Sequence, residues 1–111
     1  MTLHQSLTPD RWSQLSLATQ LMNISSEISR AESFEKKQDF PHRDSALKRA
    51  HELIQLSVAG ASTPPRQREL SRLKEMFLGA SFDPKNAFLT LADIQAELEP
   101  FASICARERG V

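Results

Sequence analysis

Polar residues whose types and spacing allow chemistry are concentrated in the first half of the chain. Asn23, Glu27 and Arg30 follow one another at spacings of four and three, so a helix presents them in one row. Arg49 lies on the next predicted helix, and antiparallel packing brings its guanidinium near the Glu27 carboxylate. The row either binds a ligand or partner, or fixes the register of two helices through salt bridges, and we expect the second role. Its members are Gln20, Asn23, Glu27, Arg30, Arg49 and Glu52.

Other catalytic and metal-binding patterns are missing from the sequence. His4, His42 and His51 have no histidine or cysteine partner at the spacing of a metal site. Cys105 falls on an apolar stripe, which is typical of a buried, inert thiol. We therefore expect no enzyme, no cofactor, no metal and no small-molecule ligand. The competing hypothesis is a hydrolase or nuclease centred on Glu27, Arg30, Arg49 and His51.

One basic stretch is a candidate for contact with nucleic acid. Its residues are Arg66, Arg68, Arg72 and Lys74. Glu69 and Glu75 interrupt it, and the aromatic residues that could stack on bases fall mostly at core positions. The chain carries 14 basic and 14 acidic residues, so no net charge attracts nucleic acid or an anionic membrane. We expect a solvated helix face here.

The length and composition indicate one folded domain spanning 1–111. Hydrophobic residues make up 40% of the chain and charged residues 25%, as in ordinary globular proteins. A lone cysteine suits a reducing compartment, and neither a signal-peptide pattern nor a run of about eighteen apolar residues occurs. We expect a cytoplasmic protein that does not enter a membrane, with a flexible lead-in at 1–8 and a fraying tail at 107–111.

The first predicted helix, Trp12–Phe34, organises the chain. Its apolar residues recur at spacings of four and three: Leu17, Leu21, Ile24, Ile28 and Ala31. It begins either near Pro9, after a Thr8 cap, or near Gln14, after a Ser13 cap. This seam packs either inside the domain or against a second subunit.

Additional apolar residues lie beside the seam. Met22 falls about 120° from its centre, and Trp12 and Leu15 lie in the opening turn. Because extra apolar surface on a helix often meets another subunit, we expect Trp12, Leu15 and Met22 to contact a partner or a second copy.

Three more helices follow. One begins with Asp44 or Ser45 as its cap and ends at Gly60, and the next begins at Pro64 and ends near Gly79. The last begins with a capping pair formed by Thr90 and Asp93, and Pro100 kinks it. The predicted fold is an all-α antiparallel bundle of about four helices.

Three segments carry a resemblance to known sequences. They are W-x-x-L-x-L-x-x-Q-L-x-N-I-x-S-E-I-x-R-A at 12–31, ALKRAHELIQL at 46–56 and RELSRLKE at 68–75. The chain resembles a group of small uncharacterised bacterial helical proteins over residues 12 to about 105. The resemblance implies a bacterial helical protein in which the polar row recurs, and it implies no substrate.

A more distant resemblance is to the HEPN bundles, which often act as RNases or as partners of nucleotidyltransferase antitoxins. Their catalytic arginine is followed a few residues later by a histidine. Arg43 precedes His51 by eight positions and Arg49 precedes it by two, so neither pair matches. We therefore expect a non-enzymatic bundle that acts through protein–protein interaction or self-association. The alternative is an accessory subunit of a nucleic-acid-processing system, assisted by Arg107 and Arg109.

Overall fold

The computed structural model describes residues 8–85, 87 and 89–108. This part of the chain is all-helical, as predicted. Its helices are α1 (Pro9–Ser13), α2 (Leu17–Lys36), α3 (Phe40–Ala59), α4 (Pro64–Phe82), α5 (Leu91–Leu98) and α6 (Pro100–Glu108). The predicted first and last helices are each divided in two, so the described residues form six helices.

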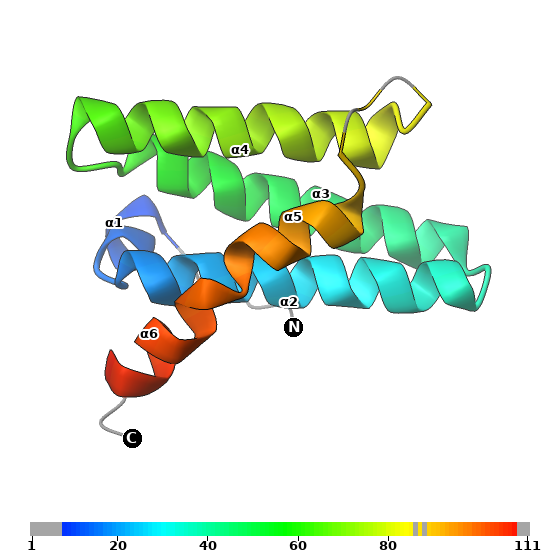
Figure 1. Ribbon diagram of the computed structural model, residues 1–111, viewed down its shortest axis with the longest axis horizontal. Coiled ribbons are helices and arrows are strands. Elements are labelled where there is room, and N and C mark those ends of the chain that lie inside the picture. Colours follow the sequence, from blue (N-terminus) through cyan, green and yellow to red (C-terminus); the bar gives the residue numbers. More distant parts are fainter. Residues whose placement is uncertain (1–7, 86, 88, 109–111) are drawn as a thin grey trace.

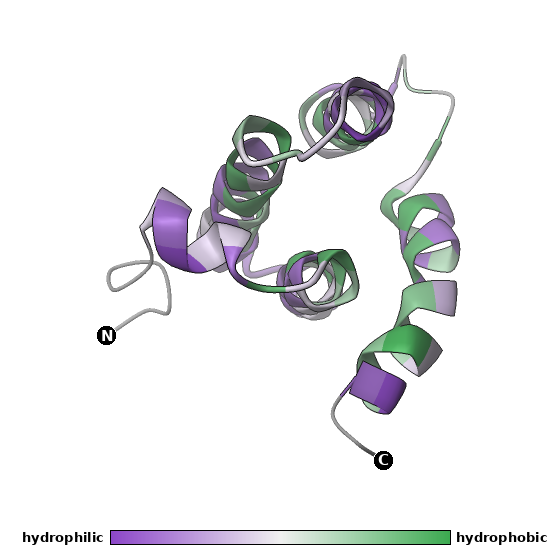
Figure 2. Ribbon diagram, turned by 90° about the vertical axis from the view of Figure 1, so that its left-hand side faces the viewer, coloured by the Kyte–Doolittle hydropathy of each residue, from purple (hydrophilic) through white to green (hydrophobic). Residues whose placement is uncertain are grey.

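The three long helices lie side by side, and each runs antiparallel to the one before it (Figure 1). In Figure 2 they occupy three corners of a triangle, with α5 and α6 across the side between α4 and α2. Helix α5 contacts both α2 and α4, α6 contacts α2, and α1 packs against α3. The helices α5 and α6 therefore form a diagonal cover over one open side of a three-helix arrangement.

The chain breaks between α1 and α2, where one continuous helix was predicted. Thr8 caps α1 as expected, since its hydroxyl accepts the N–H of Arg11 at 3.2 Å. The prediction of Ser13 as a later cap is wrong. Ser16 has a ψ of 158° and accepts the N–H of Thr19 at 3.1 Å, so α2 begins after Ser16.

Helix α3 begins earlier than predicted. Asp39, rather than Asp44 or Ser45, is its cap, and the Asp39 carboxylate accepts the backbone N–H of His42 at 3.3 Å. The prediction of a later start depends on Pro41 as a helix breaker. Proline is tolerated in the first turn of a helix, because the backbone N–H groups of that turn have no acceptor within the helix. Pro41 therefore lies in the first turn of α3 and does not end a helix.

The turn between α2 and α3 is a Schellman motif with Gln38 at the position that favours glycine. The N–H of Gln38 donates to the carbonyl of Glu35, and the N–H of Asp39 donates to the carbonyl of Phe34, both at 2.9 Å. Gln38 has a φ of 58°, which lies in the left-handed region. A residue with a Cβ is strained in that region.

The second half of the chain follows the predicted caps with two differences. Thr90 and Asp93 form the reciprocal capping box that was predicted for the last helix. Helix α4 runs past Gly79 and ends at Phe82. Pro100, which cannot donate a backbone hydrogen bond, separates α5 from α6, and the N–H of Ala102 donates to Glu99 across the bend at 3.0 Å.

The apolar seam of α2 is the centre of the core. Leu21, Ile24, Ile28 and Ala31 are buried within this chain, so the alternative of a coiled coil between subunits does not apply to them. Leu17 is half-buried at the end of the core. Among the described helices, none is long and apolar enough to cross a membrane.

The predicted flexible ends fall mostly outside the described residues, at 1–7 and 109–111. Arg107 and Glu108, which were expected to fray, belong to α6.

Candidate functional site

The structure brings together Glu27, Arg30 and Arg49 from the polar row. One carboxylate oxygen of Glu27 accepts from Arg30 Nη1 at 2.7 Å, and the other accepts from Arg49 Nε at 2.6 Å. Only 8% of the Glu27 side chain is exposed, compared with 25% for Arg49 and 64% for Arg30. The cluster therefore joins α2 to α3 through a carboxylate that is almost completely buried.

This arrangement favours a structural role for Glu27. Both of its oxygens face guanidinium groups, so neither is aimed at open space where a substrate could lie. His51 of α3 is half-buried, and its Nε2 is buried without a hydrogen-bond partner in the described part of the chain. Among the described residues, no three His, Cys, Asp or Glu side chains are grouped to hold a metal ion.

The other members of the polar row act separately. The side-chain amide of Gln20 is buried and donates to the carbonyls of Trp12 and Leu15, each at 3.1 Å, which holds the turn between α1 and α2. Asn23 donates to the carbonyl of Thr19 in its own helix at 2.9 Å. Glu52 is exposed on α3. Gln20 and Asn23 therefore make local contacts with the backbone and do not join the Glu27 cluster.

Two clusters of polar side chains that the sequence pattern did not indicate as sites lie beside the α2–α3 turn. His42 Nδ1 lies 2.8 Å from the Asp39 carboxylate, and its hydrogen bond to that group lowers the pKa of Asp39. Arg43 bonds to Asp44, which raises the pKa of Arg43, and it also bonds to Glu35. The capping position of Asp39, one residue before Phe40-Pro41, was the available signal in the sequence.

The predicted contact residues do not form an exposed apolar surface. Trp12 is completely buried, and its Nε1 donates to the Ser57 hydroxyl at 2.9 Å, so the expectation that Trp12 meets a partner is wrong. Leu15 and Met22 are half-buried and pack against the core. Trp12 is buried because the chain breaks before α2, and α1 then packs against α3.

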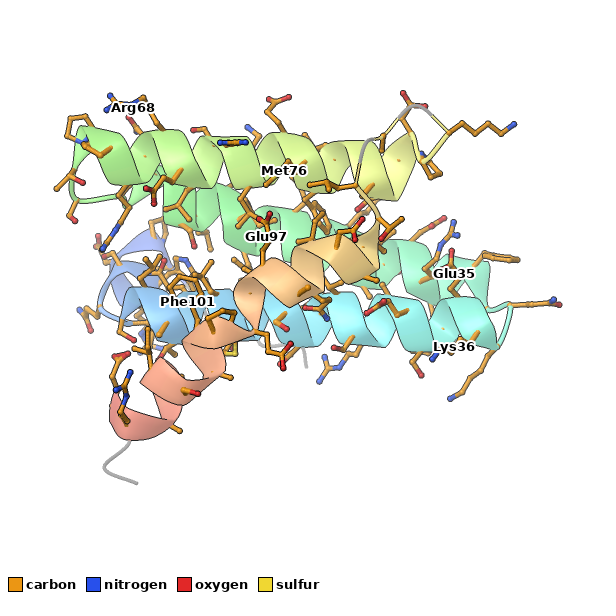
Figure 3. The ribbon with its side chains drawn as sticks, viewed as in Figure 1. Glu35, Lys36, Arg68, Met76, Glu97 and Phe101 are labelled. Carbon is orange, nitrogen blue, oxygen red and sulfur yellow. The ribbon has the colours of Figure 1, made fainter. Side chains whose placement is uncertain are left out.

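The four predicted nucleic-acid residues do not all lie on one exposed face of α4. Arg66, Arg68 and Arg72 are exposed on α4, whereas Lys74 is half-buried. Arg66 and Arg72 line an opening between α4 and its neighbours, which Arg68 does not line. Figure 3 shows Arg68 on the outer side of α4.

That opening is a groove of about 310 Å³ between α2, α4 and the α5–α6 bend, and we call it the groove below. It is lined with apolar side chains from all of these elements: Leu17, Leu21, Leu70, Leu73, Met76, Leu98 and Phe101. Its charged residues are Arg66, Glu69, Arg72 and Glu97. Figure 3 places Met76 and Glu97 between α4 and α5, and Phe101 beyond the bend on the side of α2. Apolar residues from distant parts of the sequence therefore meet where the diagonal cover leaves α4.

A larger opening of about 730 Å³ lies at the opposite end of α4. Its lining includes Arg43, Glu35 and Asp44, and these three charges pair with one another. Its lining also includes Pro84, Ala87 and Leu89, which are next to or near positions 86 and 88 outside the described part of the chain. The groove is lined by described residues from α2, α4, α5 and α6, and we take it as the candidate site.

Comparison of the chain with protein families, with curated proteins and with solved structures finds no match.

Proposed function

We propose that this protein is a non-enzymatic helical bundle that acts by binding another protein, or a second copy of itself, in the groove. The observation that carries the proposal is the apolar lining between α2, α4 and the α5–α6 bend, of which part stays accessible to solvent. Leu17, Met76 and Phe101 are only half-buried there, although they pack against the core. Covering such side chains with a partner removes apolar surface from water, which is the main source of association free energy.

The charges around the groove support a protein partner over nucleic acid. Arg66 and Arg72 are accompanied by Glu69 and Glu97, so the rim has no net charge. A phosphate backbone is bound by clustered positive charge, which this rim does not offer. The alternative of a nucleic-acid accessory subunit therefore depends on Arg68 and on residues beyond the groove.

The Glu27 cluster contributes to the proposal as a scaffold. Its ion pairs with Arg49 and Arg30 fix α2 against α3, and α2 supplies the Leu17 and Leu21 wall of the groove. We also propose a cytoplasmic location, which the single buried Cys105 suits.

Size-exclusion chromatography with light scattering, followed by affinity capture, tests the proposal. In the variant Met76→Lys, a charge is placed on the wall of the groove, and we expect the loss of self-association or of the captured partner. The matched control is Ile104→Lys, because Ile104 is a 38% exposed apolar residue on α6 that does not line the groove. A monomer that captures no partner, or a partner retained equally by both variants, would contradict the proposal.

A further inference from the structure

The groove has chemical features that specify its occupant, and the inference about that occupant rests on the function proposed above. We infer that the groove receives an amphipathic helix of a partner protein, with acidic side chains on the flank beside α4 and a basic side chain on the flank beside α5. Four properties of the groove support this assignment: its length, its openness, its apolar lining and the arrangement of its charges.

The length and depth of the groove fit a helix. Arg66 and Met76 are ten positions apart on α4, so the α4 wall extends for about 15 Å, the length of nearly three helical turns. The opening of 310 Å³ lies at the lower end of the range of about 300–1,000 Å³ for small-molecule pockets. It is also open to solvent rather than enclosed. A helix that lies along it and inserts apolar side chains from one face matches these dimensions.

The apolar lining fits the same occupant. Leu70, Leu73 and Met76 repeat every three residues along α4, and Phe101 lines the same groove from beyond the bend. Apolar side chains at spacings of three and four on a partner helix interdigitate with such a row.

The two walls of the groove carry different charges, and these charges are free to pair with a partner. On α4, Arg66 and Arg72 stand on either side of Glu69, and on α5 the wall carries Glu97. Within the described part of the chain these four side chains form no ion pair, whereas Glu27, Arg43 and Asp39 all do. Unpaired charges at the edge of an apolar groove select the orientation and identity of a partner.

The positions of these charges specify a pattern in the partner. Arg66 and Arg72 are six residues apart, or about 9 Å along α4, which corresponds to acidic residues about seven positions apart on one face of a partner helix. Glu97 lies near Met76, at the end of the groove away from Arg66 (Figure 3). The basic residue of the partner therefore lies on the opposite flank, near the acidic residue that faces Arg72.

A selection from displayed helices tests the inference and does not require that the natural partner be identified. The library fixes apolar residues at i, i+3, i+4 and i+7 and randomises the flanking positions. Selection uses the wild-type protein, with counter-selection on Met76→Lys. We expect acidic residues to be enriched on one flank and basic residues on the other.

Charge reversal then tests the assignment directly. A selected peptide should bind the triple variant Arg66→Glu, Arg72→Glu, Glu97→Lys about tenfold more weakly than wild type, and a charge-inverted peptide should bind it more tightly. Arg68→Glu, a reversal of an exposed charge outside the groove, should leave binding unchanged. Circular dichroism checks that each variant is folded.

The remaining outcomes separate the two proposals. The inference is overturned if the selected helices need Met76 for binding but show no charge preference, or if they bind the triple variant as well as wild type. Either result leaves the proposed function standing. The absence of any Met76-dependent helix overturns the inference, while capture of a partner in the experiment above still decides the proposed function. A wild-type dimer that Met76→Lys dissociates shows that the occupant is a second copy, which also overturns the inference.

Discussion

The two ion pairs of Glu27 should differ several-fold in their contribution to stability. Arg49→Met keeps the aliphatic part of the side chain but removes the charge from the nearly buried carboxylate. We expect this substitution to lower the free energy of unfolding by about 1.5–3 kcal/mol, because a buried charged group loses a hydrogen-bonded partner. Arg30→Met removes the other partner, which is 64% exposed and lies on the same helix. Its expected cost is only about 0.3–0.5 kcal/mol.

Urea and thermal unfolding measure the difference. For a domain of this size about 1 kcal/mol corresponds to about 4 °C in Tm, so we expect a decrease of roughly 6–12 °C for Arg49→Met and roughly 1–2 °C for Arg30→Met. A double-mutant cycle of Glu27→Gln with Arg49→Met should give a coupling free energy of about 1–3 kcal/mol. Equal effects of the two arginine substitutions, or a coupling near zero, would refute the view that the cluster fixes α2 against α3.

Three further substitutions test local features of the fold by thermal or pH-dependent unfolding. Gln38→Gly should stabilise the protein by about 0.5–1 kcal/mol, since it relieves the left-handed strain of the α2–α3 turn, and a loss of stability would contradict this. Ser57→Ala should destabilise it by about 1–3 kcal/mol, because it leaves the buried Trp12 N–H without an acceptor, and an unchanged Tm would show that the bond is unimportant. The hydrogen bond from His42 lowers the pKa of Asp39, so its ionised form contributes stability that is lost as pH falls from about 4 through the lowered pKa. Asp39→Asn keeps a capping side chain but does not titrate, so this variant should lose less stability than wild type over that pH range, and a curve like that of wild type would exclude the role of Asp39.

The features that local sequence determines could be predicted. The 3–4 spacing of apolar residues in α2 identified the buried seam, and the threonines at 8 and 90 identified two helix starts. Pro100 marked the bend between α5 and α6. Each of these signals acts within one or two helical turns, so it does not depend on tertiary contacts.

The features that depend on tertiary contacts could not be predicted. The break before α2 depends on Gln20, whose side chain satisfies two backbone carbonyls in the preceding turn, and on the burial of Trp12 against Ser57, 45 positions away. The sequence indicated Trp12 as an apolar residue beside the seam, but not that α1 folds back onto α3. The start of α3 was predicted too late because Pro41 can either end a helix or open one, and only the Asp39 cap decides between these roles.

The groove could not be predicted from the sequence for a related reason. Its walls come from α2, α4 and α5–α6, and each of its apolar residues is also an ordinary member of a core stripe. The spacing of an apolar stripe in the sequence does not show which of its residues the folded chain buries completely and which it buries only in part. The distinction arises at Pro100, where the chain passes from α5, which contacts α2 and α4, into α6, which contacts α2. The residue that interrupts the last helix therefore also marks the point where the cover passes from α4 to α2.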